Sequence, residues 1–193
     1  MSESWKEEWL PLQAKIGQSF GGEEVEWGAD PVEQGAVRRF LEPLEFDCQL
    51  HTDVEMAKAH GHTNLVAPSS SLLSFAMPAL WTPGRSVFVS EQRDAQIAGP
   101  AIRPLLPEEA PYCEGYFATD IEMDYLRPVL VGEHLGKRGR KLVGCSVKET
   151  KVGRGAFVTF ESEIVTRQLE VVARVRTTLF FYKPVVAKQE NLA

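Results

Sequence analysis

The sequence predicts an α+β domain in which a curved antiparallel sheet surrounds one apolar helix. The second half of the chain contains at least four segments in which apolar and polar residues alternate, the period of a half-buried strand. The first half contains helical spacings and one segment, residues 72–80, whose apolar positions leave no polar stripe. A helix without a polar stripe is expected to be buried all round, so the sheet must wrap it.

The length and composition indicate one globular domain, predicted over residues 1–184 with a tail at 185–193. The chain has 193 residues, of which 44% are hydrophobic and 25% charged. Its net charge of -6 argues against nucleic acid as a partner, and we find no signal peptide or membrane span. Three cysteines without metal-ligand spacing, Cys48, Cys113 and Cys145, suit reduced structural thiols, so we expect a cytoplasmic protein.

The N-terminal part is predicted to be mainly helical. Apolar residues at helical spacing, followed by Gly17, indicate a first helix: Trp5, Trp9, Leu12 and Ile16. Residues 20–27 alternate weakly and suggest a short strand. Asp30 and Pro31 are suited to cap and begin a second helix, which we expect to end at about Phe40 or Leu41.

Two irregular regions flank the apolar helix predicted at 72–80. Residues 45–66 are polar and contain three histidines, His51, His60 and His62, so we expect a loop. Residues 81–112 are rich in proline and glycine, which predicts extended loop with a short strand near Val87 and Val89. Loops of this length in compact domains are commonly lids or binding segments, although partial disorder is an equal alternative.

The strands are predicted from residue 117 onward. In the first, one face holds Phe117, Thr119, Ile121, Met123 and Tyr125, and the other holds Asp120, Glu122 and Asp124. The acids are expected to form a solvated edge rather than a metal site, since no histidine joins them. Strands follow at 141–149 and 157–165, and the last is predicted to point these residues inward: Leu169, Val171, Ala173, Val175, Leu179 and Phe181. The basic run of Lys137, Arg138, Arg140 and Lys141 is expected at a solvated strand entrance.

Three motifs lie in order along the chain. They are Leu50-His51-Thr52-Asp53 continued by Met56-Ala57, then Leu65-Val66-Ala67-Pro68, then Tyr125-Leu126-Arg127-Pro128-Val129 with Gly132-Glu133. In content and order they resemble the MaoC-like hydratase/dehydratase family, most of all its N-terminal, fatty-acid-synthase-like dehydratase domain, and the resemblance spans roughly residues 16 to 183. By this resemblance, contact with CoA phosphates is the alternative role of the basic run at 137–141. The resemblance implies a hot-dog fold and reversible hydration of a 2-enoyl-CoA or related acyl-carrier thioester, without a metal or redox cofactor.

The resemblance also implies roles for individual residues. His51 matches the family histidine and is assigned as the general base, because imidazole exchanges protons near neutral pH. The amides of Ser69 and Ser70 match the groups that stabilise the thioester oxyanion, since the first turn of a helix leaves its N–H groups unpaired. Capping of the helix is the simpler use of the two serine side chains.

The chain departs from the family at the acid. Aligned without a gap, the family aspartate falls on Phe46, while Asp47 stands four residues before His51. Three interpretations follow: Asp47 acts with His51, Glu45 replaces it, or the chain is a silent half that shapes the acyl tunnel beside an active MaoC-like partner. We take Asp47 and His51 as the predicted catalytic pair.

The sequence is compatible with two kinds of partner and with two reaction classes. Exposed sheet edges predict a homodimer or a heteromer with another MaoC-like subunit. A rival reaction on the same fold is thioester hydrolysis, in which a carboxylate activates water against the carbonyl carbon. A metal pair at His60 and His62 lacks a third ligand at familiar spacing. No phosphate-binding glycine loop or serine nucleophile elbow is present in the sequence.

Overall fold

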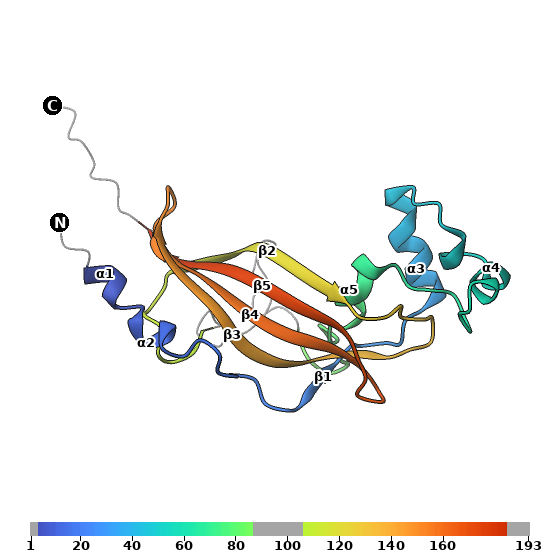
Figure 1. Ribbon diagram of the computed structural model, residues 1–193, viewed down its shortest axis with the longest axis horizontal. Helices are drawn as coiled ribbons and strands as arrows, with labels where there is room; N and C mark the ends of the chain where they lie inside the picture. The colour runs from blue at the N-terminus through green and yellow to red at the C-terminus, as the bar shows by residue number, and fades with distance from the viewer. Residues whose placement is uncertain (1–3, 87–105, 185–193) are drawn as a thin grey trace.

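A five-stranded antiparallel sheet forms the body of the protein (Figure 1). The computed structural model describes residues 4–86 and 106–184. The strand order is β1-β3-β4-β5-β2, so β1 and β2 form the two edges. The strands are β1 (Val25–Trp27), β2 (Gly115–Tyr125), β3 (Leu135–Glu149), β4 (Arg154–Thr166) and β5 (Val171–Lys183). The four predicted long strands are therefore confirmed.

Short helices lie at the two ends of the sheet (Figure 1). At one end are α1 (Ser4–Glu7) and α2 (Leu10–Gln13). The α-helices at the other end are α3 (Gln34–Leu41), α4 (Val54–Ala59) and α5 (Leu72–Phe75). Three 3-10 turns complete the elements: η1 (Glu42–Leu44), η2 (Gln49–His51) and η3 (Ser69–Ser71). In the described parts of the chain, no helix is long and apolar enough to cross a membrane.

The N-terminal predictions are only partly correct. The first helix is divided into α1 and α2; Trp9 and Leu12 are buried as expected, but Ile16 is exposed. The second predicted helix, α3, ends at Leu41 as expected but begins three residues later than Pro31 suggested, at Gln34. The predicted loop at 45–66 is wrong in part, because it contains η2 and α4. The Asp53 carboxylate caps α4 by accepting two backbone N–H groups, at 2.9 and 3.2 Å.

The prediction of a long buried helix at 72–80 is wrong. The α-helix ends at Phe75, and although Ala76 is still buried, later apolar side chains are exposed, Met77 by 64% and Leu80 by 71%. Backbone packing explains the early end, because the Ala29 N–H donates to the Met77 carbonyl at 2.9 Å. A Cβ on Gly28 would lie 2.0 Å from the Phe75 carbonyl oxygen, so only glycine permits this approach. Leu72 alone among the α5 residues is fully buried.

The sheet is covered at its two ends by separate cores. One core groups α3, α5 and the strand ends near them, with Leu72, Leu135 and Ile164 among its fully buried members. The second core groups the N-terminal helices with the opposite strand ends, with Leu12 and Phe181 at its centre. The predicted α+β fold with one antiparallel sheet is therefore confirmed, although the helix α5 that packs on the sheet is shorter than predicted and a second core lies at the other end.

A β-bulge and a turn correct two of the predicted inward-facing positions. A bulge between Ala118 and Asp120 moves Phe117 to the face that carries Glu122, whereas Ile121 stays on the core side. Leu169, predicted to point inward, lies in the turn before β5 with a φ of 63° and is exposed. The basic run lies inside β3 rather than at its entrance. The predicted strand near Val87 and Val89 and the tail at 185–193 fall outside the described residues.

Candidate active site

A cavity of about 710 Å³ lies beside the end of β2, where η2, η3 and α3 converge. It contains three of the four predicted site residues, His51, Ser69 and Ser70. Most of its wall is apolar, with Arg127 as its one permanently charged group among the described residues. The other lining residues are Phe40, Leu41, Leu44, Phe46, Cys48, Leu50, Val66, Ala67, Pro68, Tyr125, Leu126 and Pro128.

The His51 imidazole is held in one orientation by a backbone bond. Its Nδ1 lies 2.7 Å from the Val66 carbonyl oxygen, which only accepts hydrogen bonds, so Nδ1 carries the proton in the neutral ring. The other nitrogen, Nε2, then keeps its lone pair. The ring also lies 5.8 Å, centroid to centroid, from the Phe46 ring. The local geometry therefore leaves a basic nitrogen on a fixed imidazole.

The peptide that holds His51 is itself fixed along both of its edges. The Val66 N–H donates to the Leu50 carbonyl at 2.9 Å, and the Ala67 N–H donates to the Val129 carbonyl at 2.7 Å. This short extended segment continues through Pro68 into η3. One run of chain thus positions both the acceptor of the imidazole and the first-turn amides of Ser69 and Ser70.

Two ion pairs of Arg127 fix another part of the cavity wall. The Arg127 guanidinium donates to both carboxylate oxygens of Glu133, at 2.7 and 3.1 Å, and to Glu170 at 2.7 Å. Glu133 also accepts the Leu130 N–H at 2.7 Å. Hydrogen bonds to Glu133, and then to Glu170, raise the pKa of Arg127 above its ordinary value. Arg127 is consequently committed to shaping this wall.

The predicted acids lie outside the cavity. Asp47 lines a neighbouring hollow of about 450 Å³ with Met56 and His60, and only Cys48 and Leu50 line both spaces. Glu45 has a left-handed backbone with a φ of 48° and lines neither. Among the residues that the structure describes, no carboxylate lines the cavity with His51. The fold therefore unites His51 with the serines and separates it from Asp47.

Sequence reasoning missed the apolar wall of the cavity. Leu44, Phe46, Tyr125 and Leu126 are all about half exposed, at 47–59%, so the cavity is open on this side. Tyr125 and Leu126 belong to the third motif, and Tyr125 also to the first predicted strand, but neither pattern predicts a lining role for them. Phe46 did have a sequence signal, because the family aspartate falls on it in the ungapped alignment. Leu44 lies in η1, outside every motif, and had none.

The other polar groups singled out in the sequence do not reach this cavity. The His60 Nδ1 is bonded to the Met56 carbonyl at 2.9 Å, inside its own helix end. In the basic run, Arg138 pairs with Glu163 at 2.9 Å, and Arg140 lies 4.2 Å above the Phe160 ring. Burial lowers the pKa of Arg140. In the described chain, none of these residues lines the cavity.

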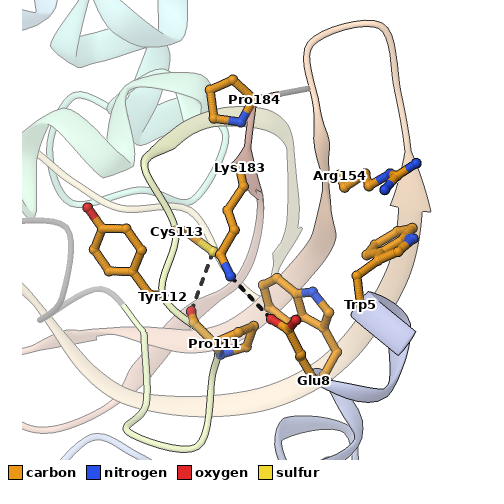
Figure 2. Close-up of a pocket in the computed structure, with 9 residues that line it drawn as sticks. Trp5, Glu8, Pro111, Tyr112, Cys113, Arg154, Lys183 and Pro184 are labelled. Atoms are coloured by element: carbon orange, nitrogen blue, oxygen red, sulfur yellow. Dashed lines mark hydrogen bonds and ion pairs between the residues drawn. The ribbon is translucent and has the colours of Figure 1, made fainter. Parts of the chain in front are cut away.

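A second cavity, of about 320 Å³, lies between the N-terminal helices and the far ends of β4 and β5 (Figure 2). Figure 2 shows the Lys183 ammonium directed at Glu8, with a separation of 3.2 Å, and Arg154 beside Trp5. Burial raises the pKa of the Cys113 thiol in its wall to about 11, which keeps the thiol protonated. The two cations that line this second cavity already have carboxylate partners, Glu8 for Lys183 and Glu149 for Arg154.

Comparisons with known proteins agree with this architecture. The family described as "FAS1-like, dehydratase domain region" matches residues 16–175. The chain is 27% identical over 178 residues to a probable enoyl-CoA hydratase alpha subunit of Thermomonospora curvata, covering 92% of this chain and 53% of that protein. It is 29% identical over 157 residues to the 3-oxo-4,17-pregnadiene-20-carboxyl-CoA hydratase alpha subunit of Mycobacterium tuberculosis, covering 80% of this chain and 46% of that protein. The chain thus spans about half the length of these curated relatives.

Solved structures share the fold. A chain of the ChsH1-ChsH2 complex from Mycobacterium tuberculosis superposes with a TM-score of 0.65 at 23% identity, covering 96% of this chain and 100% of that chain. A MaoC-like dehydratase from Rhodospirillum rubrum superposes with a TM-score of 0.52 at 21% identity, covering 88% and 94%. The predicted hot-dog fold is thereby confirmed. The chain belongs to the FAS1-like dehydratase region family and is a MaoC-like hot-dog protein.

Proposed function

We propose that the chain is a subunit of an acyl-thioester hydratase/dehydratase, which reversibly hydrates a 2-enoyl-CoA or related thioester to the 3-hydroxyacyl thioester. The observation that carries the proposal is the combination, in one cavity, of an apolar wall, a fixed imidazole and the start of a helix. The family membership and the hydratase names of the two curated relatives support it.

Each part of the cavity has a role in this chemistry. The apolar wall accommodates the acyl chain, and the Ser69 and Ser70 amides stabilise the negative charge that gathers on the thioester carbonyl oxygen. The His51 Nε2 accepts a proton from water as the hydroxyl adds to the double bond, and the neighbouring carbon takes up a proton from an acid. Hydration involves no net electron transfer to or from the enzyme, so the proposal includes no redox cofactor.

The acid in this scheme comes from outside the cavity described above. Tyr125 is both the last residue of the edge strand β2 and part of the cavity wall, so a partner strand on β2 would reach the open side. We therefore propose a heteromer with another MaoC-like chain that supplies the carboxylate, in place of Asp47. The two curated relatives are named alpha subunits, and a similar fold occurs in the ChsH1-ChsH2 complex. We expect the assembly to act in the cytoplasm.

A second candidate function rests on the predicted acidic residues, which lie away from the cavity. Since no carboxylate from the described residues lines the cavity, the chain would serve as the silent half that shapes the acyl tunnel, while the partner carries out the chemistry. In that case His51 contributes shape and not proton transfer.

The test uses the purified full chain, alone and co-purified with a MaoC-like partner from the same source. Crotonyl-CoA and longer enoyl-CoAs are supplied, and the double-bond absorbance and free thiol are followed together. We expect loss of the double bond without thiol release, and only in the heteromer. Thiol release would identify a thioesterase instead. Absence of both signals in every assembly would refute the hydratase proposal.

A further inference from the structure

The edge strand β2 has the features of an unoccupied interface. It is 11 residues long, whereas β1 at the opposite edge has three, and within the described residues no strand pairs with its outer side. Its core-side apolar residues are partly exposed, with Ile121 at 52% and Tyr116 at 42%. A long edge with exposed apolar side chains is suited to a covering strand, because its free N–H and C=O groups can pair with another chain.

The charge on this edge has one sign. Between Gly115 and Tyr125 the strand contains Asp120, Glu122 and Asp124 and no basic residue. Two cations lie across the strand pair on β5, with Arg174 opposite Asp124 and Arg176 opposite Glu122. Arg176 lies 3.5 Å from Glu122 and 3.1 Å from Asp124.

Arg176 neutralises this edge only in part. It also pairs with Glu161 at 3.0 Å, so its one charge is shared among three carboxylates. In the described part of the chain, Asp120 forms no ion pair. Asp120 lies opposite Thr178, so it has no cation across the strand pair. A strand that approaches β2 from outside therefore meets the acids first, while the arginines lie one strand further in.

A second copy of this chain is a poor partner for such an edge. Two identical edge strands pair antiparallel about a two-fold axis, and Asp120 is the central residue of β2. An axis through Asp120 places this carboxylate opposite its own counterpart. An axis through Glu122 places all three acids opposite acids of the copy. Like charges directly opposite one another destabilise a strand pair.

We infer that β2 is a partner-selecting edge, which disfavours a second copy of this chain and binds the edge strand of an unlike chain that carries Lys or Arg on the same face. Repulsion of the wrong partner and attraction of the right one act together here. The inference rests on the proposed heteromeric function and identifies the surface that enforces it.

The test needs no knowledge of the natural partner, because a charge-reversed copy of this chain replaces it. Three full-length variants are compared with the wild type: D120N/E122Q/D124N, which neutralises the edge; D120K/E122K/D124K, which reverses it; and E23Q/E24Q/E26Q, which makes the same change in net charge at and before β1. Circular dichroism and melting curves verify the fold of each. Sedimentation velocity at micromolar concentrations measures association at low and high salt.

We expect the wild type alone to be monomeric at low salt and the neutralised variant to dimerise with a dissociation constant about tenfold lower or more. The variant at β1 should behave as the wild type does. An equimolar mixture of wild type and the lysine variant should form a 1:1 complex that dissociates at high salt, because screening weakens its charge pairs.

A wild-type homodimer that is stable at low salt, with unchanged affinity in the neutralised variant, would overturn the inference. Since the lysine variant adds cations beside Arg176, the neutralised variant decides the result if the lysine variant does not fold. The sedimentation measurements do not depend on activity, so partner selection and the hydratase proposal can fail separately. An active homodimer would overturn partner selection and leave the hydratase proposal intact, whereas an inactive but selective heteromer would do the reverse.

Discussion

Replacing His51 with asparagine separates the chemical role of the imidazole from its structural role. The asparagine side-chain NH₂ takes the place of Nδ1 and keeps a donor for the Val66 carbonyl, which the imidazole reaches at 2.7 Å. The variant lacks a nitrogen at the Nε2 position. Since the backbone bond is kept, we expect the free energy of unfolding to change by less than about 1 kcal/mol.

The catalytic effect of His51→Asn should be much larger than its effect on stability. Loss of a general base typically lowers the rate by about 10²–10⁴-fold, which is about 3–5 kcal/mol of transition-state stabilisation. We expect kcat/KM for crotonyl-CoA to fall by this factor in the active assembly, measured from double-bond absorbance.

His60→Asn is the matched control for this experiment. The His60 Nδ1 makes the same kind of bond, to the Met56 carbonyl at 2.9 Å, but His60 does not line the cavity. It should retain wild-type activity and a similar melting temperature. A His51→Asn assembly within about threefold of wild-type activity would refute the general-base role and favour the tunnel-shaping role.

Three further perturbations test the fold around the site. Gly28→Ala should destabilise the protein by about 3 kcal/mol, because the added Cβ would lie 2.0 Å from a backbone carbonyl oxygen of α5. Gly35→Ala is the control, because its added Cβ meets open space and should not destabilise the protein. Equal urea midpoints for the two variants would contradict the packing described. The hydrogen bond from Arg127 lowers the pKa of the Glu170 carboxyl. The ion pair therefore stabilises the fold above the unfolded pKa of about 4.3, and this stabilisation is lost as the pH falls through the folded pKa. Glu170→Gln should remove this part of the pH dependence of urea unfolding, and an unchanged pH profile would argue against the ion pair. Because burial raises the pKa of Cys113 to about 11, iodoacetamide should alkylate this thiol slowly at pH 8 until urea unfolds the chain, and rapid native labelling found by peptide mass spectrometry would contradict its burial.

The sequence alone determined the strands and the family. Alternation along 171–183 is a local property, since successive side chains of a strand point to opposite faces, and it placed Ala173 and Val175 in the core correctly. The order of three motifs predicted the MaoC-like fold, which the comparisons confirm. Two of those motifs also contained His51 and Arg127, residues that the structure places in one cavity.

Tertiary structure decided where the helix after Ser71 ends and where a bulge shifts the alternation along β2. The apolar composition of 72–80 predicted a long buried helix, but contacts from Gly28 and Ala29 accompany its end at Phe75. One inserted residue, Thr119, moved Phe117 to the other face of β2, and no alternation pattern records a bulge in advance.

The composition of the site was likewise decided by the fold. Asp47 and His51 are four residues apart, a spacing that one helical turn would bring together. Instead, Asp47 precedes η2 and faces a different hollow, while Val66, fifteen residues from His51, orients the imidazole. Sequence spacing predicts proximity only within one regular element. Between elements, proximity depends on which backbone N–H and C=O groups form hydrogen bonds with one another, and those pairs exist only in the folded chain.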